Sequence, residues 1–201
     1  MKSRFFSYLV AGAAISFAAC QGTGDGTDTT TDTSAIETAP DNTRNADTAT
    51  VATTLDNKTS DFAKEAVNGG MMEVELGQLA QQKAVTQRVK DFGAMMVRDH
   101  TKANDDLKNA VSGKITVSST MPEQHQKHIN DLRDEQGIEF DKEYMEMMVD
   151  DHQKDIKKFE EIAKDSKDPA VRDFAKNTLP TLYTHLDSAK AIRMALSKMR
   201  K

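Results

Sequence analysis

The chain has 201 residues, of which 37% are hydrophobic and 5% aromatic, with 4 Pro and no Trp. So few aromatic residues and turn formers argue against a β-sandwich, whereas abundant Met, Ala, Leu, Lys and Glu favour helices. The single cysteine excludes a disulfide within the chain and a zinc site built on cysteines. The net charge of −5 argues against a nucleic-acid-binding protein.

The N-terminus has the features of a secretory signal. Two basic residues precede an apolar run from Phe5 to Phe17, which is short for a membrane span and predicts a signal peptide at residues 1–19. Small residues lead directly into Cys20, an ending that resembles the lipobox of bacterial lipoproteins. The resemblance implies a lipidated Cys20 that anchors the mature chain in the bacterial cell envelope, at the outer membrane, with its domain in the periplasm or at the surface. The alternative is ordinary signal cleavage that leaves a free cysteine.

Residues 20–58 differ in character from the rest of the chain. Thr and Asp dominate them, no apolar period appears, and Arg44 is the one basic residue between Gln21 and Asn57. Such a segment cannot bury enough apolar surface to offset the entropy lost on ordering. We therefore predict a disordered linker, followed by a folded domain over residues 59–201.

The folded region has apolar residues at spacings of three and four, which is typical of amphipathic helices. We predict helices over about 60–83, 86–111, 121–135, 139–164 and 169–199, with Ser60 as the N-cap of the first. The first and last connections between long helices are short, and the middle one is long. This pattern predicts an all-α, ferritin-like four-helix bundle with an extra short helix in the middle connection.

Several segments of the domain together point to a family. Residues 95–102 read MMVRDHTK and recur at 147–154 as MMVDDHQK, while residues 69–77 read GGMMEVELG and residues 140–144 read FDKEY. Residues 179–182 read LPTL, shortly before His185. In combination these segments resemble the bacterial envelope family called domain of unknown function 4142, over roughly Ser60 to Ser197. The resemblance implies a ferritin-like bundle in the envelope and no established biochemical role.

One polar residue interrupts the apolar stripe of each long helix, namely Glu73, His100, His152 and His185. With a rise of 1.5 Å per residue, their distances from the nearest interhelical turns place all four in one central layer. Imidazole and carboxylate groups are ligands of transition metals such as Zn, Cu, Mn or Fe. The layer is therefore a candidate metal site.

The carboxylates of Asp99 and Asp151 each neighbour one of these histidines in the sequence and could orient the imidazoles by hydrogen bonding. The alternative is a structural layer whose groups hydrogen-bond one another and fix the register of the bundle. His125 and His128, three residues apart on the short helix, could also hold a metal, although solvated surface side chains are the simpler explanation.

Three functions follow from the sequence. The first is a non-enzymatic envelope lipoprotein with a structural or stress-related role, for which the sequence identifies no protein partner. The second is a bundle that binds or senses a metal through its central layer. The third is a metal-dependent oxidoreductase. The chain has no Glu-x-x-His segment, which di-iron oxidases use twice, and this argues against ferroxidase activity or iron storage.

Overall fold

The computed structural model describes residues 54–199. The predicted signal peptide, Cys20 and nearly all of the predicted linker lie outside these residues. The described part is all-α, as predicted, and contains five helices. Their bounds are α1 Asn57–Lys83, α2 Gln87–Ala110, α3 Glu123–Asp134, α4 Gly137–Asp165 and α5 Pro169–Leu196.

The ends of the helices differ from the sequence predictions by up to three residues. Helix α1 begins earlier than predicted because Asp56, not Ser60, is its N-cap, and its carboxylate accepts a hydrogen bond from Thr59 N at 2.9 Å. Helix α5 ends at Leu196, three residues before the predicted end. Its N-cap is Asp168, which accepts from Val171 N at 3.0 Å, and Pro169 follows in the first turn.

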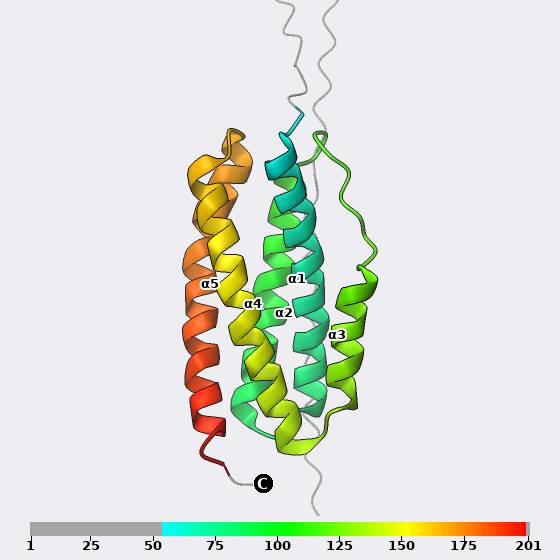
Figure 1. The fold of residues 1–201 in the computed structure, drawn as a ribbon, viewed down its shortest axis with the longest axis vertical. Coiled ribbons are helices and arrows are strands. Elements are labelled where there is room, and N and C mark those ends of the chain that lie inside the picture. The colour runs from blue at the N-terminus through cyan, green and yellow to red at the C-terminus, as the bar shows by residue number, and fades with distance from the viewer. Residues whose placement is uncertain (1–53, 200–201) are drawn as a thin grey trace, which may run out of the picture. The chain divides into compact units, whose positions relative to one another are not determined.

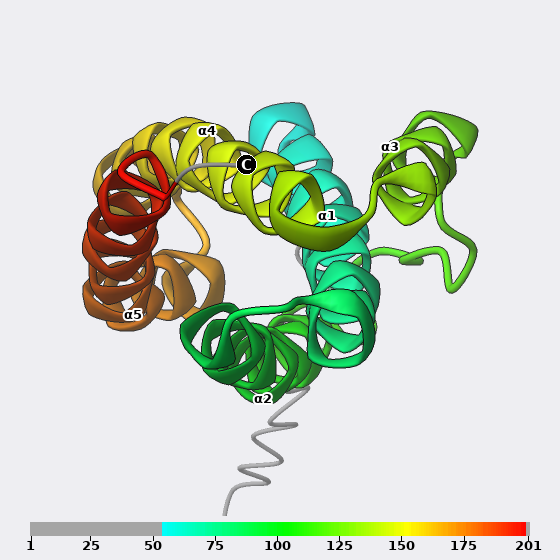
Figure 2. The same ribbon diagram turned by 90° about the horizontal axis from the view of Figure 1, so that it is seen from below.

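The four long helices form a bundle of two antiparallel hairpins, α1–α2 and α4–α5 (Figure 1). Seen along its axis, α2 lies diagonally opposite α4 and α1 lies diagonally opposite α5 (Figure 2). The connection after α2 crosses the length of the bundle and carries α3, which packs outside against α1 and α4. Since α2 and α4 then run in the same direction, the two repeated Met-Met-Val segments are parallel.

The core is continuous along the bundle and consists of apolar side chains from all five helices. The backbones of α1 and α2 approach closely at Gly77 and Gly93, where a Cβ atom built on either glycine would lie 2.7 Å from the carbonyl oxygen of the other. Such a contact excludes any side chain at these two positions. The close approach fixes the spacing of α1 and α2 in the half of the bundle that contains the turn between them.

A buried carboxylate joins the two hairpins near the α1–α2 turn. Asp141 of α4 is fully buried and accepts hydrogen bonds from Val85 N at 2.9 Å and from Thr86 N at 2.8 Å. These two N–H groups precede α2, so α4 supplies the acceptor that the start of α2 needs. This contact explains the aspartate in the segment FDKEY, for which the sequence offered no role.

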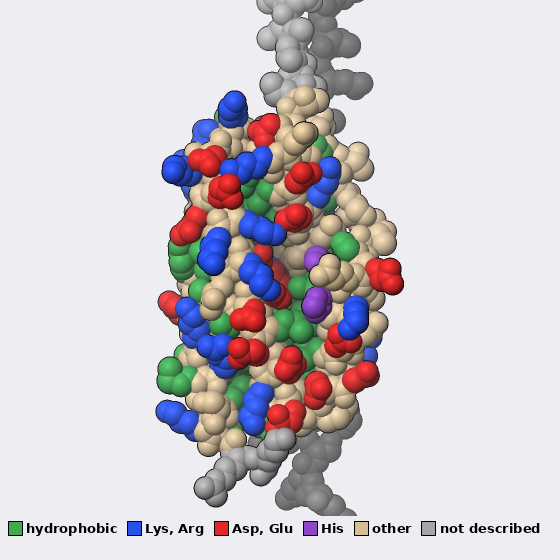
Figure 3. Space-filling model, in the orientation of Figure 1, with side chains coloured by type: hydrophobic (Ala, Val, Ile, Leu, Met, Phe, Trp, Pro, Cys, Tyr) green, Lys and Arg blue, Asp and Glu red, His purple; other side chains and the backbone are tan. Residues whose placement is uncertain are grey.

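The surface of the bundle carries both signs of charge. Acidic and basic side chains are intermixed over the face shown in Figure 3, without a large patch of one sign. Among residues 54–199, none of the helices combines the length and the apolar character that crossing a bilayer requires.

Candidate metal centre

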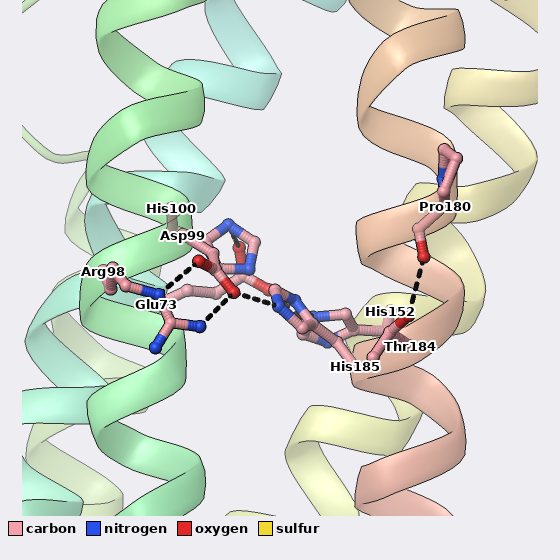
Figure 4. A network of polar contacts seen from close by, with 8 residues as sticks. All are labelled: Glu73, Arg98, Asp99, His100, His152, Pro180, Thr184 and His185. Carbon is pink, nitrogen blue, oxygen red and sulfur yellow. Dashed lines mark hydrogen bonds and ion pairs between the residues drawn. The ribbon is translucent and has the colours of Figure 1, made fainter.

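The four polar residues of the predicted central layer meet in the middle of the bundle (Figure 4). Glu73 comes from α1, His100 from α2, His152 from α4 and His185 from α5. Their exposed fractions are 2%, 6%, 0% and 1%, so water reaches none of them freely. Each occupies a core-facing position of its helix, which is why the helical period alone directs all four side chains inward.

Each imidazole uses one ring nitrogen to contact an acceptor at the edge of the cluster. His100 Nδ1 lies 2.9 Å from Glu73 Oε2, and His152 Nδ1 lies 2.9 Å from the carbonyl oxygen of Met148. His185 Nε2 lies 3.0 Å from Asp99 Oδ2. A backbone carbonyl can only accept, so the His152 nitrogen carries the proton and donates it to Met148. The same reasoning applies to His185 beside the Asp99 carboxylate.

The remaining ring nitrogens of His152 and His185 face one another. One ligand nitrogen from each of the three histidines lies within 4.8 Å of the other two, and His152 Nε2 and His185 Nδ1 are 3.2 Å apart. A tetrahedral zinc ion with Zn–N bonds of about 2.0–2.1 Å holds its nitrogen ligands roughly 3.3 Å apart. The spacing of this pair therefore matches two adjacent ligands of one metal ion. The ligand nitrogens of all three histidines are only within 4.8 Å of one another, so His100 would have to move closer to complete the set.

The protons on the outer nitrogens determine what the inner nitrogens can do. A neutral imidazole has one protonated nitrogen and one lone pair. Because His152 and His185 donate outward, their two inner nitrogens face each other as lone pairs without a proton between them. Two acceptors at this distance repel, and a cation between them removes the repulsion.

Burial shifts the proton equilibria of the cluster. It lowers the pKa of His100, His152 and His185 to about 4, so the imidazoles are neutral at physiological pH. Burial also raises the pKa of Glu73 to about 7, against the opposing effect of His152. Neutral imidazoles are the protonation state that binds metals.

Asp99 supports His185 on the opposite hairpin, not its sequence neighbour His100. Successive residues of a helix point about 100° apart, so an aspartate beside a core histidine faces the boundary with the next helix. Arg98 pairs with the same carboxylate at 2.8 Å. Burial raises the pKa of Asp99, but the hydrogen bonds from Arg98 and His185 outweigh it, and the net pKa lies below the usual value. Asp99 is therefore a charged acceptor.

Asp151, the other predicted supporting carboxylate, lies outside the cluster. Its Oδ1 pairs with Lys154 Nζ at 3.3 Å, and it contacts no histidine among the described residues. The two aspartates of the repeated segments therefore occupy different environments. Instead, the carbonyl oxygen of Met148 accepts the hydrogen bond of His152, the histidine next to Asp151. A backbone acceptor of this kind cannot be recognised from a pattern of residue types.

Comparison with known protein families identifies one that contains this domain. The family described as domain of unknown function (DUF4142) matches residues 44–192, which include all four groups of the cluster. The chain belongs to the DUF4142 family. It matches no curated protein and no solved structure.

Unpaired polar atoms of the DUF4142 domain gather at the same layer. Among the described residues, the buried side-chain atoms without a hydrogen-bond partner include Glu73 Oε1, His100 Nε2 and Tyr144 Oη. Glu73 acts electrostatically on the Tyr144 hydroxyl, and burial raises the pKa of that hydroxyl well above its usual value. Buried polar atoms are seldom left without a hydrogen-bond partner, so this concentration suits a bound ion or water molecule. The residues present therefore fit a metal ion.

The second predicted histidine pair lies on α3, outside the bundle. His128 is exposed and His125 is half-buried, and the three-histidine cluster does not include either of them. The Nδ1 atom of His125 is buried without a partner. These two residues provide a natural control for any test of the central cluster.

Proposed function

We propose that this DUF4142 domain binds one divalent transition-metal ion through His100, His152 and His185. The observation that supports this function best is the pair of facing lone pairs on His152 and His185 at 3.2 Å. Glu73, Asp99 and the Met148 carbonyl hold the three rings by their outer nitrogens. Imidazole ligands with such supporting acceptors are a common arrangement in metal sites.

The charge of the site favours a divalent ion. Burial raises the pKa of Asp155 to about 7, with a further contribution from Glu73, so these two neighbouring carboxyls do not both ionise easily without a cation. A divalent ion neutralises both of them. Three imidazoles suit Zn²⁺, Cu²⁺ and Fe²⁺ better than Mn²⁺, which prefers oxygen ligands. Zn²⁺ is our first choice because its tetrahedral geometry matches the nitrogen spacing.

The competing function is a structural layer held only by hydrogen bonds. It requires a proton between His152 and His185, which means an imidazolium on a fully buried residue. Burial acts against that charge, since it lowers the pKa of both rings to about 4. The hydrogen-bonded layer therefore lacks its proton at neutral pH, and we favour the metal.

Thermal unfolding of the mature chain, with and without metal, tests the proposed site. A metal at 100 times its dissociation constant stabilises the folded state by about 2.7 kcal/mol. We expect Zn²⁺ to raise the melting temperature of the metal-free wild type. The increase is lost in His100→Ala, His152→Ala and His185→Ala, because each substitution removes a ligand. The His125→Ala/His128→Ala double variant keeps it.

Two results would contradict the metal site. One is a melting temperature that Zn²⁺, Cu²⁺, Mn²⁺ and Fe²⁺ all leave unchanged, after mass spectrometry has confirmed that the starting protein is metal-free. The other is a metal-dependent increase that disappears only in the His125/His128 double variant, which assigns the binding to α3.

We also propose that this domain is held at the cell envelope by a lipid on Cys20, as a non-enzymatic metal-binding lipoprotein. The support is the sequence, in which small residues precede the single cysteine at the end of an apolar run. Several acyl chains on one cysteine anchor a protein stably, since two lipid signals already suffice.

Cys20→Ser tests the anchor. Detergent phase partitioning of cells that express the chain should find the wild type in the detergent phase and the variant in the aqueous phase. Unchanged partitioning of the variant would exclude lipidation as the anchor. The metal-dependent melting of the bundle should not change, because Cys20 is remote in sequence from all four groups of the cluster.

A further inference from the structure

A small cavity adjoins the histidine cluster. It has a volume of about 30 Å³, and by this measure about 10–15 Å³ is enough to hold one water molecule. Side chains from all four bundle helices line it, and those with charge or metal-binding capacity at its inner part are Glu73, His100 and Asp155. Apolar side chains, including Phe159 and Leu182, close other walls.

Two of these lining residues have an unpaired atom. Glu73 Oε1 and His100 Nε2 are buried without a hydrogen-bond partner, although their residues are at least 94% buried, with exposed fractions of 2% and 6%. Asp155 is half-buried and makes no hydrogen bond or ion pair with any described residue. Its strongest attraction within the cluster is electrostatic, toward His100. The cavity thus combines acceptors and one lone pair with room for a single small molecule.

Three histidines leave one position of a tetrahedral ion without a protein ligand. Metal sites of this composition hold water or an exogenous ligand at the fourth position. The cavity borders the cluster, because Glu73 and His100 both line it. We propose that the fourth position of the metal opens into this cavity and holds a small, exchangeable ligand, with the Asp155 carboxylate as its hydrogen-bond acceptor.

This inference rests on the proposed metal site and assigns it a ligand class. Small anions such as azide can replace a metal-bound water, whereas the volume excludes larger organic ligands. Asp155 acts as a positioning residue, because it touches the exchangeable ligand and leaves the three metal-binding imidazoles unchanged. Its negative charge disfavours an anion at that position.

Cobalt spectroscopy of the full mature chain tests the inference. Co²⁺ reports its coordination through visible absorption, and azide is the probe ligand. At pH 8 we expect azide to change the spectrum of the wild type. Asp155→Asn should bind azide at least about tenfold more tightly, because a like charge has been removed. Asp151→Asn is the matched control, one turn earlier on α4 and paired with Lys154, and should change the affinity less than about threefold.

A second variant fills the cavity without changing its charge. Ala66 lines the cavity, so Ala66→Leu should keep the Co²⁺ spectrum and lose the response to azide. Circular dichroism shows whether this variant remains folded, and the Asp155→Asn result stands independently of it.

The outcomes separate this inference from the metal site itself. A Co²⁺ spectrum that azide leaves unchanged overturns the open position, while the metal site remains. Azide binding that appears only in Asp155→Asn also overturns it, since Asp155 is then itself the fourth ligand. Absence of any Co²⁺ binding overturns both proposals together.

Discussion

Asp141 and Glu73 are both buried carboxylates, yet their surroundings differ. Asp141, near the α1–α2 turn, uses both oxygens to accept backbone N–H groups at 2.8 and 2.9 Å. Glu73, in the central layer, contacts His100 through Oε2, while its Oε1 lies 3.6 Å from His152 Nδ1 and makes no hydrogen bond. The structure therefore contains one complete polar contact and one incomplete polar cluster, within the same core.

The difference separates a structural role from a binding role. A buried acceptor with all its donors in the protein stabilises a fold and needs nothing else. A buried cluster with unpaired atoms and facing lone pairs is stable only together with something that the protein does not supply. The comparison predicts that a substitution of Asp141 lowers stability and leaves metal binding unchanged. Substitutions in the central layer should instead weaken metal binding and leave the stability of the metal-free protein unchanged.

The largest expected effect is that of Asp141→Ala. The substitution leaves two N–H groups at the start of α2 without their charged acceptor, and hydrogen bonds to charged groups contribute about 1.5–3 kcal/mol each. We expect the free energy of unfolding to fall by about 3 kcal/mol in urea denaturation. The stabilisation by Zn²⁺ should equal that of the wild type. A loss of Zn²⁺ binding in a folded Asp141→Ala protein would remove the distinction between the two regions.

A smaller effect is expected for Asp99→Ala, which removes the acceptor of His185. Loss of such a supporting carboxylate typically lowers metal affinity by about 10- to 100-fold. Competition with a chromogenic chelator measures this affinity. Asp151→Ala, the equivalent aspartate of the other repeated segment, is the control and should bind Zn²⁺ like the wild type. Equal losses in the two variants would mean that overall charge, and not the contact with His185, determines the affinity.

The last expected effect is the dependence of metal affinity on pH, to which Glu73 and Asp155 both contribute. With Glu73 ionised, it accepts the proton of His100 Nδ1 and leaves His100 Nε2 free for the metal. Its pKa of about 7 in the metal-free protein means that it is protonated below that pH, so metal binding must release its proton.

The affinity should therefore rise with pH, by up to about tenfold per unit, until it levels off above pH 7. The histidines contribute little in this range, because their pKa values of about 4 keep them neutral. Glu73→Gln removes one of the two titrating carboxyls but keeps an acceptor, and should make the profile shallower between pH 5 and 7. A Glu73→Gln profile as steep as that of the wild type would assign the proton to another group.

The helical period and rise predicted much of this arrangement. Placing Glu73, His100, His152 and His185 on the stripes of four helices was sufficient to bring them into one layer, because helix geometry is nearly independent of context. The exact ends of the helices were less predictable. Asp56, rather than Ser60, caps α1, and both residue types are good N-caps.

The contacts between hairpins were not predictable from local sequence. Asp99 supports His185, 86 residues away, and Asp141 accepts from the residues before α2, some 55 residues away. These pairings depend on which helices are neighbours and how they are rotated. The position of Asp155 beside a cavity was not predictable either. Its helix contains many acidic residues, and the sequence does not distinguish the one that borders a cavity.

The division of the bundle into two hairpins has a consequence for assembly. Glu73 and His100 belong to the α1–α2 hairpin, while His152 and His185 belong to the α4–α5 hairpin. Neither hairpin contains the three imidazoles, so the metal site forms only when the two halves dock. A bound ion then links segments that the chain joins through one long crossover. Any opening that separates the halves releases the ion, and the lifetime of the bound metal measures how often the docked halves come apart.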